Sequence, residues 1–322
     1  MQYNIEIHPA GVSYKSEKNL LEDALLSNLP LEHSCKTGNC GVCSATVLSG
    51  AIENEDGVVV TSGQVLVCQS KARSDAILKA HYYPELAHIK TQTLPCKVSS
   101  IEYPLSDIVV IKLRFPPTAQ FDYMPGQYVD LSFKGVKRSY SIANASSSNK
   151  EVELHIRKVP KGEMSTRIFG ELKENQLMRI EGPKGTFFVK DGDKPLILIA
   201  TGTGIAPIKA MVEDLVSRED TRNIYIYWGM QYSDEIYCKE LESLATKHEH
   251  IELTPVLSRD ETVSQFNKGY VQDAVLSRFP SLEGFEVYAC GSPKMIEQAK
   301  LLFGNKNLSE DAFFSDAFTS AK

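Results

Sequence analysis

The sequence lacks the features that would place it at once among membrane, secreted or nucleic-acid-binding proteins. No apolar run reaches the roughly 18 residues that a membrane-spanning helix needs, and the first twenty residues hold four charges and no apolar core of a signal peptide. We therefore expect no membrane anchor and a cytoplasmic location. Basic blocks are also lacking, and 35 basic against 41 acidic residues give a net charge of −6. This balance argues against a nucleic-acid partner, which would require a cationic surface.

The composition is otherwise that of an ordinary globular protein. Hydrophobic residues make up 42% of the 322 residues and charged residues 24%, which excludes a disordered or collagen-like chain. At about 100–200 residues per domain, this length predicts two or three domains. The seven cysteines are odd in number, and in a reducing compartment their spacing indicates ligation or redox chemistry rather than disulfides.

The first of three stretches of different pattern covers residues 1–90. It combines short apolar alternations, beginning at 2–7, with a helical pattern at 19–28 and a loop dense in Cys and Gly. Short β-like runs follow at 45–48, 58–60 and 65–68. Residues 84–95 show no clear period between two prolines and are interpreted as a linker.

The second stretch, residues 94–190, is rich in strand patterns. Runs separated by Pro, Gly, Ser and Asn predict six strands, at 97–103, 108–114, 127–133, 139–143, 152–159 and 177–181. Six short strands at this spacing favour a small antiparallel β-barrel. One helix is expected within the stretch, at 164–172.

The third stretch, residues 191–322, alternates between strand and helix patterns. Strands are predicted at 195–200, 223–228, 251–257 and 285–289, and helices at 205–217, 234–247, 270–278 and 293–303. This alternation is typical of a parallel sheet with crossover helices. A last strand is expected at 313–318. The whole chain is thus predicted to be a multidomain protein of the α+β and α/β classes.

Four cysteines follow the pattern Cys-x4-Cys-x2-Cys with a distant fourth member, which is the plant-type spacing for a 2Fe-2S cluster. They are Cys35, Cys40, Cys43 and Cys68. Gly38 and Gly41 lie between the first three and allow the loop to curl tightly around a cluster. Small residues also let backbone N–H groups approach the sulfur atoms.

Three other uses of these cysteines are less favoured. A zinc site usually shows two short Cys-x2–4-Cys pairs, whereas this sequence has one three-cysteine loop and a lone fourth cysteine. A thioredoxin-like role for Cys40 and Cys43 would place them at the start of a helix after a strand. A Rieske centre needs two His ligands, and His33 is a single histidine near the loop.

The segment Arg138-Ser139-Tyr140-Ser141 has the side chains that a flavin requires. The Arg can neutralise a pyrophosphate, the Tyr can stack on a ring, and a Ser can hydrogen-bond a flavin edge. In a regular strand, the period of two places Arg138 and Tyr140 on one face and the two serines on the other. The tetrapeptide alone is a weak signal.

A second phosphate-binding feature lies some twenty residues later, at the expected start of a helix. Gly162, Met164 and Ser165 belong to this start, where free N–H groups and the helix dipole favour an anion. An ordinary capped helix, with Ser165 as a local capping residue, is the alternative. Because Arg138 precedes it by one pair of strands, we favour a flavin-phosphate site.

A third feature follows the apolar strand predicted at 195–200. Thr201-Gly202-Thr203-Gly204 leads into a helix with Pro207 in its first turn, an arrangement that suits a dinucleotide phosphate. Pro207 stands where a Gly-x-Gly-x-x-Gly fingerprint has its third glycine, and no Gly-Lys-Ser/Thr of a Walker sequence follows.

Cys290-Gly291 ends the last main strand of the same stretch. Ligands of parallel sheets bind beyond the carboxyl ends of the strands, so Cys290 and Gly291 are expected beside the segment 201–207. The alternative for Cys290 is a small buried apolar residue.

Taken together and in this order, these motifs resemble the ferredoxin–NADP reductase superfamily, in its members with a fused N-terminal plant-type ferredoxin. The resemblance implies a β-grasp ferredoxin domain at 1–90, a FAD-binding antiparallel β-barrel at 94–190 and an NAD(P)H-binding α/β domain at 191–322. It also implies that Ser141, Cys290 and Asp316 align the nicotinamide with the flavin and that Phe318 stacks over the flavin ring. Asp316-Ala317-Phe318 matches the family's Glu-x-aromatic with Asp in place of Glu.

The resemblance further implies an enzyme that passes electrons from NADH, through FAD and a 2Fe-2S cluster, to a partner protein. That partner is expected to be a pyridoxamine-phosphate-dependent CDP-6-deoxyhexulose 3-dehydrase of 3,6-dideoxyhexose synthesis. The alternatives are the reductase of an aromatic-ring or alkane oxygenase, and a passive electron carrier without catalysis. NADH is favoured over NADPH because residues 230–235 are acidic and lack an Arg for a 2′-phosphate.

Overall fold

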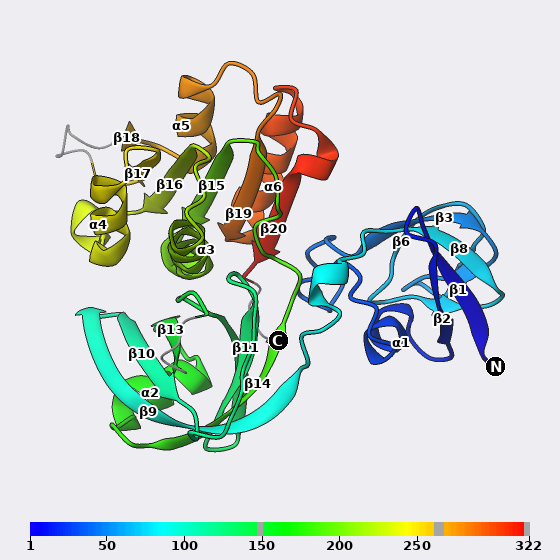
Figure 1. The fold of residues 1–322 in the computed structure, drawn as a ribbon, viewed down its shortest axis with the longest axis horizontal. Helices are drawn as coiled ribbons and strands as arrows, with labels where there is room; N and C mark the ends of the chain where they lie inside the picture. Colours follow the sequence, from blue (N-terminus) through cyan, green and yellow to red (C-terminus); the bar gives the residue numbers. More distant parts are fainter. Residues whose placement is uncertain (147–150, 261–266, 319–322) are drawn as a thin grey trace. The chain divides into compact units, whose positions relative to one another are not determined.

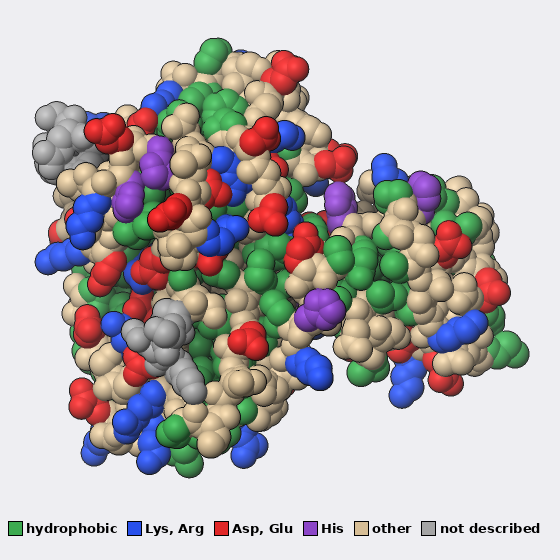
Figure 2. Space-filling view, viewed as in Figure 1, with side chains coloured by type: hydrophobic (Ala, Val, Ile, Leu, Met, Phe, Trp, Pro, Cys, Tyr) green, Lys and Arg blue, Asp and Glu red, His purple; other side chains and the backbone are tan. Residues whose placement is uncertain are grey.

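In the computed structural model, which describes residues 1–146, 151–260 and 267–318, the chain forms two units, Met1–Lys90 and Thr91–Lys322 (Figure 1). No helix among the described residues is both long and apolar enough to cross a membrane. On the face that Figure 2 shows, acidic and basic side chains are intermixed, and the described residues form no extended patch of Lys and Arg there.

The first unit is built on a five-stranded sheet with the order β2-β1-β8-β3-β6. Its strands are β1 (Tyr3–His8), β2 (Val12–Ser16), β3 (Ser44–Ser49), β6 (Gly63–Leu66) and β8 (Ala76–Lys79). A smaller sheet contains β4 (Ile52–Glu53), β5 (Val59–Val60) and β7 (Lys71–Ala72), and the helical segments are α1 (Leu20–Leu26) and η1 (Pro84–Leu86). The β1–β8 pair is parallel and the other paired strands are antiparallel.

Two expectations for this unit need correction at their boundaries. The helix predicted at 19–28 begins after Asn19, whose side-chain oxygen accepts hydrogen bonds from the N–H groups of Leu21 and Glu22. It ends before Asn28, which has a positive φ. The strand predicted at 65–68 ends at Leu66, so Cys68 lies in the segment after the strand.

The second unit begins with a six-stranded antiparallel sheet of order β12-β11-β14-β9-β10-β13. The strands are β9 (Gln92–Leu105), β10 (Ile108–Arg114), β11 (Tyr128–Phe133), β12 (Val136–Ser141), β13 (Glu151–Arg157) and β14 (Leu177–Lys184). A bridge between Ile142 and Leu154 joins the two edges of the sheet, as expected for a curled antiparallel sheet. Helix α2 (Glu163–Glu171) follows β13.

The predicted linker at 84–95 is wrong at its carboxyl end. Residues Gln92–Leu94 already belong to β9, where they pair with Gly182, Glu181 and Ile180 of β14. Because this pairing joins segments about 90 residues apart, no local pattern indicates it.

The second unit continues with a six-stranded parallel sheet of order β18-β17-β16-β15-β19-β20. The strands are β15 (Leu196–Thr201), β16 (Ile224–Met230), β17 (Ile251–Leu257), β18 (Asn267–Lys268), β19 (Glu286–Gly291) and β20 (Phe313–Ala317). The helices are α3 (Ile205–Ser217), α4 (Lys239–Lys247), α5 (Val271–Arg278) and α6 (Pro293–Gly304), with the short turns η2 (Gly202–Gly204), η3 (Ser233–Glu235) and η4 (Glu310–Ala312).

The helix predicted at 234–247 is wrong over its first five residues, because α4 starts at Lys239. The Glu235 carboxylate accepts hydrogen bonds from the N–H groups of Gln231 and Tyr232. These bonds hold residues 231–235 in a separate turn, after which the backbone of Ile236 is extended. Side-chain bonds to nearby backbone groups compete with helix formation in this way.

The parallel sheet is covered on both faces, which explains the uninterrupted apolar sequence of β15. Leu196 and Leu198 lie in one core with α3, and Ile197 and Ile199 lie in a second core with α5 and α6. Ile108 of β10 joins the α3 core. The antiparallel sheet is therefore packed against the α3 face of the parallel sheet.

Candidate functional site

The four cysteines expected to bind iron lie in two contacting pairs. The Sγ atoms of Cys43 and Cys68 are 3.1 Å apart, and the thiols of Cys35 and Cys40 are hydrogen-bonded to each other. Among the described residues, no three His, Cys, Asp or Glu side chains converge as a single metal ion would require. A 2Fe-2S cluster needs two cysteine thiols for each of its two iron atoms. A tetrahedral zinc site needs four ligand atoms around a single ion.

The protonation of these thiols follows their pairing. The hydrogen bond from Cys40 lowers the pKa of Cys35, and the hydrogen bond from Cys43 lowers the pKa of Cys68. One member of each pair is thereby favoured as a thiolate, which is the form that binds metal. The residues present fit the cluster.

Gln69 is a residue of this site that the sequence reasoning missed. Its side-chain N–H donates to the carbonyl oxygens of Lys36 and Cys68, at 3.0 and 2.9 Å, and its Nε2 lies 3.6 Å from Cys68 Sγ. A Cβ on Gly38 would lie 3.1 Å from the Gln69 side chain. Gln69 therefore holds the three-cysteine loop against the fourth cysteine. In the sequence, only its position directly after Cys68 could have indicated that Gln69 belongs to the cluster site.

The predicted flavin residues lie on β12, at an edge of the antiparallel sheet. Tyr140 packs against the apolar core of this sheet, and the Arg138 guanidinium donates to the carbonyl of Lys137 at 2.7 Å. Ser139 is exposed and donates to a carboxylate oxygen of Asp130 at 2.6 Å. Ser141 is buried at the end of the strand.

The predicted phosphate site lies at the start of α2. Gly162 precedes the helix with extended backbone, and no side chain of the described residues caps the first turn. Ser165 accepts a hydrogen bond from the Val159 N–H at 3.1 Å and so holds the preceding loop, while Met164 is buried. Ser165 thus has the local structural role of the alternative, while the first turn of α2 keeps N–H groups that no side chain of the described residues caps. Phosphate binding at this turn stays a prediction.

The segment after β15 forms a tight turn against β19. A Cβ on Gly204 would lie 2.4 Å from the carbonyl oxygen of Cys290, and one on Gly291 would lie 2.1 Å from the Thr201 hydroxyl. Only glycine allows such contacts. Thr203 lies within η2, and Pro207 is buried in the first turn of α3. Trp228, which the sequence reasoning missed, donates its indole N–H to the carbonyl of Gly202 at 3.0 Å.

The structure brings Cys290, Gly291, Asp316 and Phe318 together at the ends of β19 and β20. Cys290 pairs with Asp316 across the two strands, and the Phe318 N–H donates to the Gly291 carbonyl at 2.8 Å. Burial, together with the charge of Asp316, raises the pKa of the Cys290 thiol. The thiol is therefore neutral. This edge holds the carboxyl ends of the parallel strands, where such sheets bind ligands.

Arg157, at the end of β13, is a third residue that sequence reasoning missed. Its guanidinium Nη1 lies 3.5 Å from the position of a Cβ on Gly202. The same guanidinium binds Asp107 at 2.8 Å and Glu235 at 3.4 Å. The antiparallel sheet thus places a cation, paired with two carboxylates, beside the glycine turn of the parallel sheet, and dinucleotide binding at this turn stays a prediction.

Comparison with known families matches each stretch of the chain to one domain type. Residues 5–73 match the 2Fe-2S iron-sulfur cluster binding domain, residues 95–189 the oxidoreductase FAD-binding domain, and residues 198–301 the oxidoreductase NAD-binding domain.

Full-length relatives share this arrangement. The chain is 46% identical to the CDP-6-deoxy-L-threo-D-glycero-4-hexulose-3-dehydrase reductase of Yersinia pseudotuberculosis, over 100% of both chains. It is 30% identical to a terephthalate 1,2-dioxygenase reductase component of Comamonas, over 100% of this chain and 98% of the relative. Among solved structures, a cytochrome P450 reductase of Amycolatopsis, GcoB, matches with a TM-score of 0.80 and 26% identity, over 99% of this chain and 100% of that one. The chain therefore belongs to the ferredoxin–NADP reductase superfamily, in the group whose members carry an N-terminal 2Fe-2S domain.

Proposed function

We propose that this protein passes electrons from NADH, through FAD and a 2Fe-2S cluster, to a pyridoxamine-phosphate-dependent CDP-6-deoxyhexulose 3-dehydrase. Its oxidoreductase character and its three cofactors follow from the three matched domains. The partner is supported by one observation: identity is 46% to the dehydrase reductase but 30% to the dioxygenase reductase component, at similar coverage. The dehydrase belongs to the synthesis of 3,6-dideoxyhexoses, which are O-antigen sugars of lipopolysaccharide.

FAD supplies the chemistry that connects the other two groups, because a flavin accepts two electrons with a hydride and releases them singly. In the proposal, Arg138, Ser139, Tyr140 and Ser141 hold the flavin, and the first turn of α2 binds its phosphates. Thr201–Gly204 and Pro207 hold the dinucleotide, with Arg157 as an added cation.

The reacting rings are proposed to meet beside Ser141, Cys290 and Asp316. Because the Cys290 thiol is neutral and fully buried, its proposed role is to add no charge beside the nicotinamide. Phe318, 38% exposed, is proposed to cover the flavin ring and to be displaced by the nicotinamide. Cys35, Cys40, Cys43 and Cys68 bind the two irons.

Three finer expectations remain predictions. The domains are proposed as 1–90 with a β-grasp fold, 94–190 as an antiparallel β-barrel that binds FAD and 191–322 as the NAD(P)H-binding α/β domain. The cytoplasmic location is likewise kept as a prediction. The preference for NADH rests on Asp234 and Glu235 after β16, where a 2′-phosphate would meet negative charge. The ratio of kcat/KM for NADH and NADPH tests this preference.

The function itself is tested by an optical spectrum of the purified protein before and after anaerobic addition of NADH, with iron, sulfide and flavin analysis. We expect flavin and cluster absorption, both bleached by NADH. A protein reconstituted with iron, sulfide and FAD that NADH fails to bleach would contradict the proposal.

The partner is tested separately, by electron transfer to the purified dehydrase and to a ring-hydroxylating oxygenase. We expect faster cluster oxidation by the dehydrase in the presence of its sugar substrate. Faster oxidation by the oxygenase would favour the alternative, in which this chain is an oxygenase reductase.

A further inference from the structure

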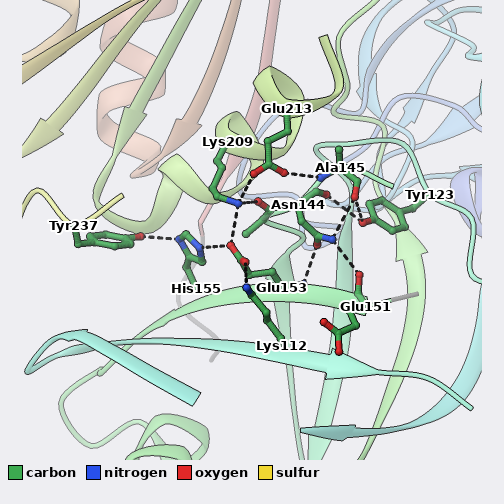
Figure 3. Close-up of polar contacts among 11 residues, drawn as sticks. Lys112, Tyr123, Asn144, Ala145, Glu151, Glu153, His155, Lys209, Glu213 and Tyr237 are labelled. Carbon is green, nitrogen blue, oxygen red and sulfur yellow. Dashed lines mark hydrogen bonds and ion pairs between the residues drawn. The ribbon is translucent and has the colours of Figure 1, made fainter. Parts of the chain in front are cut away.

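A buried lysine on α3 contacts the backbone just beyond the predicted flavin strand. Lys209 lies one turn after Ile205, the first residue of α3, and is 3% exposed. Its Nζ donates to the carbonyl oxygen of Ala143 at 3.1 Å, and Ala143 is two residues beyond Ser141. Figure 3 shows the ammonium group of Lys209 between the carboxylates of Glu213 and Glu153.

Two carboxylates complete the surroundings of this ammonium group. Glu213, one turn further along α3, accepts from Lys209 at 2.6 Å, and its other oxygen accepts from the Ala145 N–H at 3.0 Å. Glu153 of β13 lies 3.1 Å from the same Nζ. Helix α3 thus binds both a carbonyl and an N–H group of the segment 143–145.

The Glu153 carboxylate is held by a second chain of contacts. His155 Nε2 lies 2.9 Å from Glu153, and His155 Nδ1 lies 2.9 Å from the hydroxyl of Tyr237, which follows η3 (Figure 3). Burial alone would raise the pKa of Glu153, but the His155 hydrogen bond and the Lys209 charge lower it to about 2. Glu153 therefore remains a charged partner of Lys209 at neutral pH.

The same segment is also fixed from within the antiparallel sheet. The Tyr123 hydroxyl lies 3.1 and 3.0 Å from the carbonyl oxygens of Asn144 and Ala145. The apolar contact of Ile108 with the α3 core joins the sheets as well, but apolar packing is non-directional and tolerates sliding. Charge-assisted hydrogen bonds are directional and short-ranged, so this network sets the position of α3 along the segment.

We propose that Lys209 is a positioning residue for hydride transfer, because it ties the helix that begins at the nucleotide turn to the backbone just after the flavin strand. The hydrogen bonds of Lys209 thereby set the distance between the nicotinamide and the flavin ring. This inference rests on the proposed function, and it assigns Lys209 no contact with either cofactor. A misplacement of reacting groups by about 1 Å can lower a rate by about 100-fold.

The test compares Lys209→Met, Lys209→Arg and a matched control, Lys112→Met. Lys112 lies 3.7 Å from the same Glu153 carboxylate, but it is on β10 of the antiparallel sheet and 41% exposed. Single-turnover flavin reduction is measured over a range of NADH concentrations. We expect the rate at saturating NADH to fall about tenfold or more in Lys209→Met, with the Kd for NADH changed less than about twofold.

Lys209→Arg, which keeps the cation, is expected to recover part of the rate, and Lys112→Met is expected to match the wild type.

A second readout needs no cofactor: hydrogen exchange of residues 142–146 in the FAD-free protein. Exchange at the Ala145 amide should accelerate in Lys209→Met and not in Lys112→Met. If Lys209→Met does not fold, Lys209→Gln replaces it, since it keeps a polar side chain at this buried position and removes the ammonium group that binds Ala143.

A folded, FAD-loaded Lys209→Met, or its substitute Lys209→Gln, that is reduced at the wild-type rate would overturn this inference alone. An FAD-loaded wild type that NADH does not reduce would overturn the proposed function, and this inference with it. A slowed rate in Lys112→Met equal to that of Lys209→Met would show that charge around Glu153 matters rather than the tie to α3, and would also overturn the inference.

Discussion

Gly204 lies against the backbone of Cys290, so closely that a Cβ on the glycine would be 2.4 Å from the cysteine's carbonyl oxygen. The φ of Gly204 is −59°, a value that any residue adopts, so the requirement for glycine here is spatial rather than conformational. This contact holds the start of α3 against the end of β19 and shapes the turn proposed to bind the dinucleotide.

Replacing this glycine should damage both stability and NADH binding. In Gly204→Ala the new methyl group meets a backbone oxygen, which cannot rotate away, and we expect a loss of about 1–3 kcal/mol of unfolding free energy with a raised KM for NADH. Thermal unfolding and steady-state kinetics measure the two effects. Gly170→Ala is the matched control, because a Cβ there meets nothing within 4 Å. Equal behaviour of the two variants would contradict the argument.

The buried thiol of Cys290 is expected to matter for hydride transfer. Cys290→Ser places a smaller and more polar group beside Asp316, and we expect flavin reduction to slow by about tenfold or more while the cluster remains intact. Stopped-flow reduction by NADH and the cluster spectrum are the measurements. Unchanged reduction kinetics would remove Cys290 from the mechanism.

The Gln69 side chain should tune the iron–sulfur site. Gln69→Leu removes the donor near Cys68 Sγ, and since such donors stabilise the more negative reduced cluster, the reduction potential should fall by tens of millivolts. A redox titration followed by electron paramagnetic resonance measures the potential. Gln64→Leu, at an exposed position of β6, is the control. A potential that stays at the wild-type value in Gln69→Leu would refute this role.

The guanidinium of Arg157 should bind the dinucleotide phosphates. Charge-assisted hydrogen bonds contribute roughly 1.5–3 kcal/mol, so Arg157→Gln should raise the KM for NADH by about tenfold with a smaller effect on kcat. Arg218→Gln, which removes an Arg paired with Asp214 at the end of α3, controls for the loss of charge. The prediction fails if both variants show the same KM.

Glu153 should contribute stability that is lost in acid. Its pKa of about 2 in the folded protein is below the ordinary 4.5. A lowered pKa stabilises the folded state above pH 4.5, and this stabilisation disappears as the pH falls toward 2; the shift corresponds to about 3 kcal/mol. Urea unfolding between pH 7 and pH 3 in Glu153→Gln should therefore depend less on pH than in the wild type.

Trp228 is the one tryptophan of the sequence and is fully buried in the parallel sheet, so its fluorescence reports on this unit. Glu171→Gln is the control for the acid prediction, because its pair with Lys134 is exposed and solvent screens such pairs. An acid loss in Glu153→Gln as steep as that in Glu171→Gln would contradict the prediction.

Local patterns predicted many of the elements within one or two residues. The strands at 108–114 and 251–257 and the helix at 205–217 have the expected bounds, because each has a regular apolar period. The start of β9 at Gln92 and the late start of α4 at Lys239 were not predicted. The first depends on pairing with β14 and the second on the Glu235 side chain, so neither follows from the residues' own preferences.

The sequence by itself determined the chemistry of this protein. Three of the four cysteines, the Arg-Ser-Tyr-Ser strand and the glycine turn are short local motifs, so their spacing can be read from the sequence without the fold. Only the tertiary structure decided which distant side chains support them: Gln69 beside Lys36, Arg157 against Gly202, and Lys209 at Ala143. These contacts join segments that are 33 or more residues apart, and such long-range contacts form only when the packed core brings the elements together.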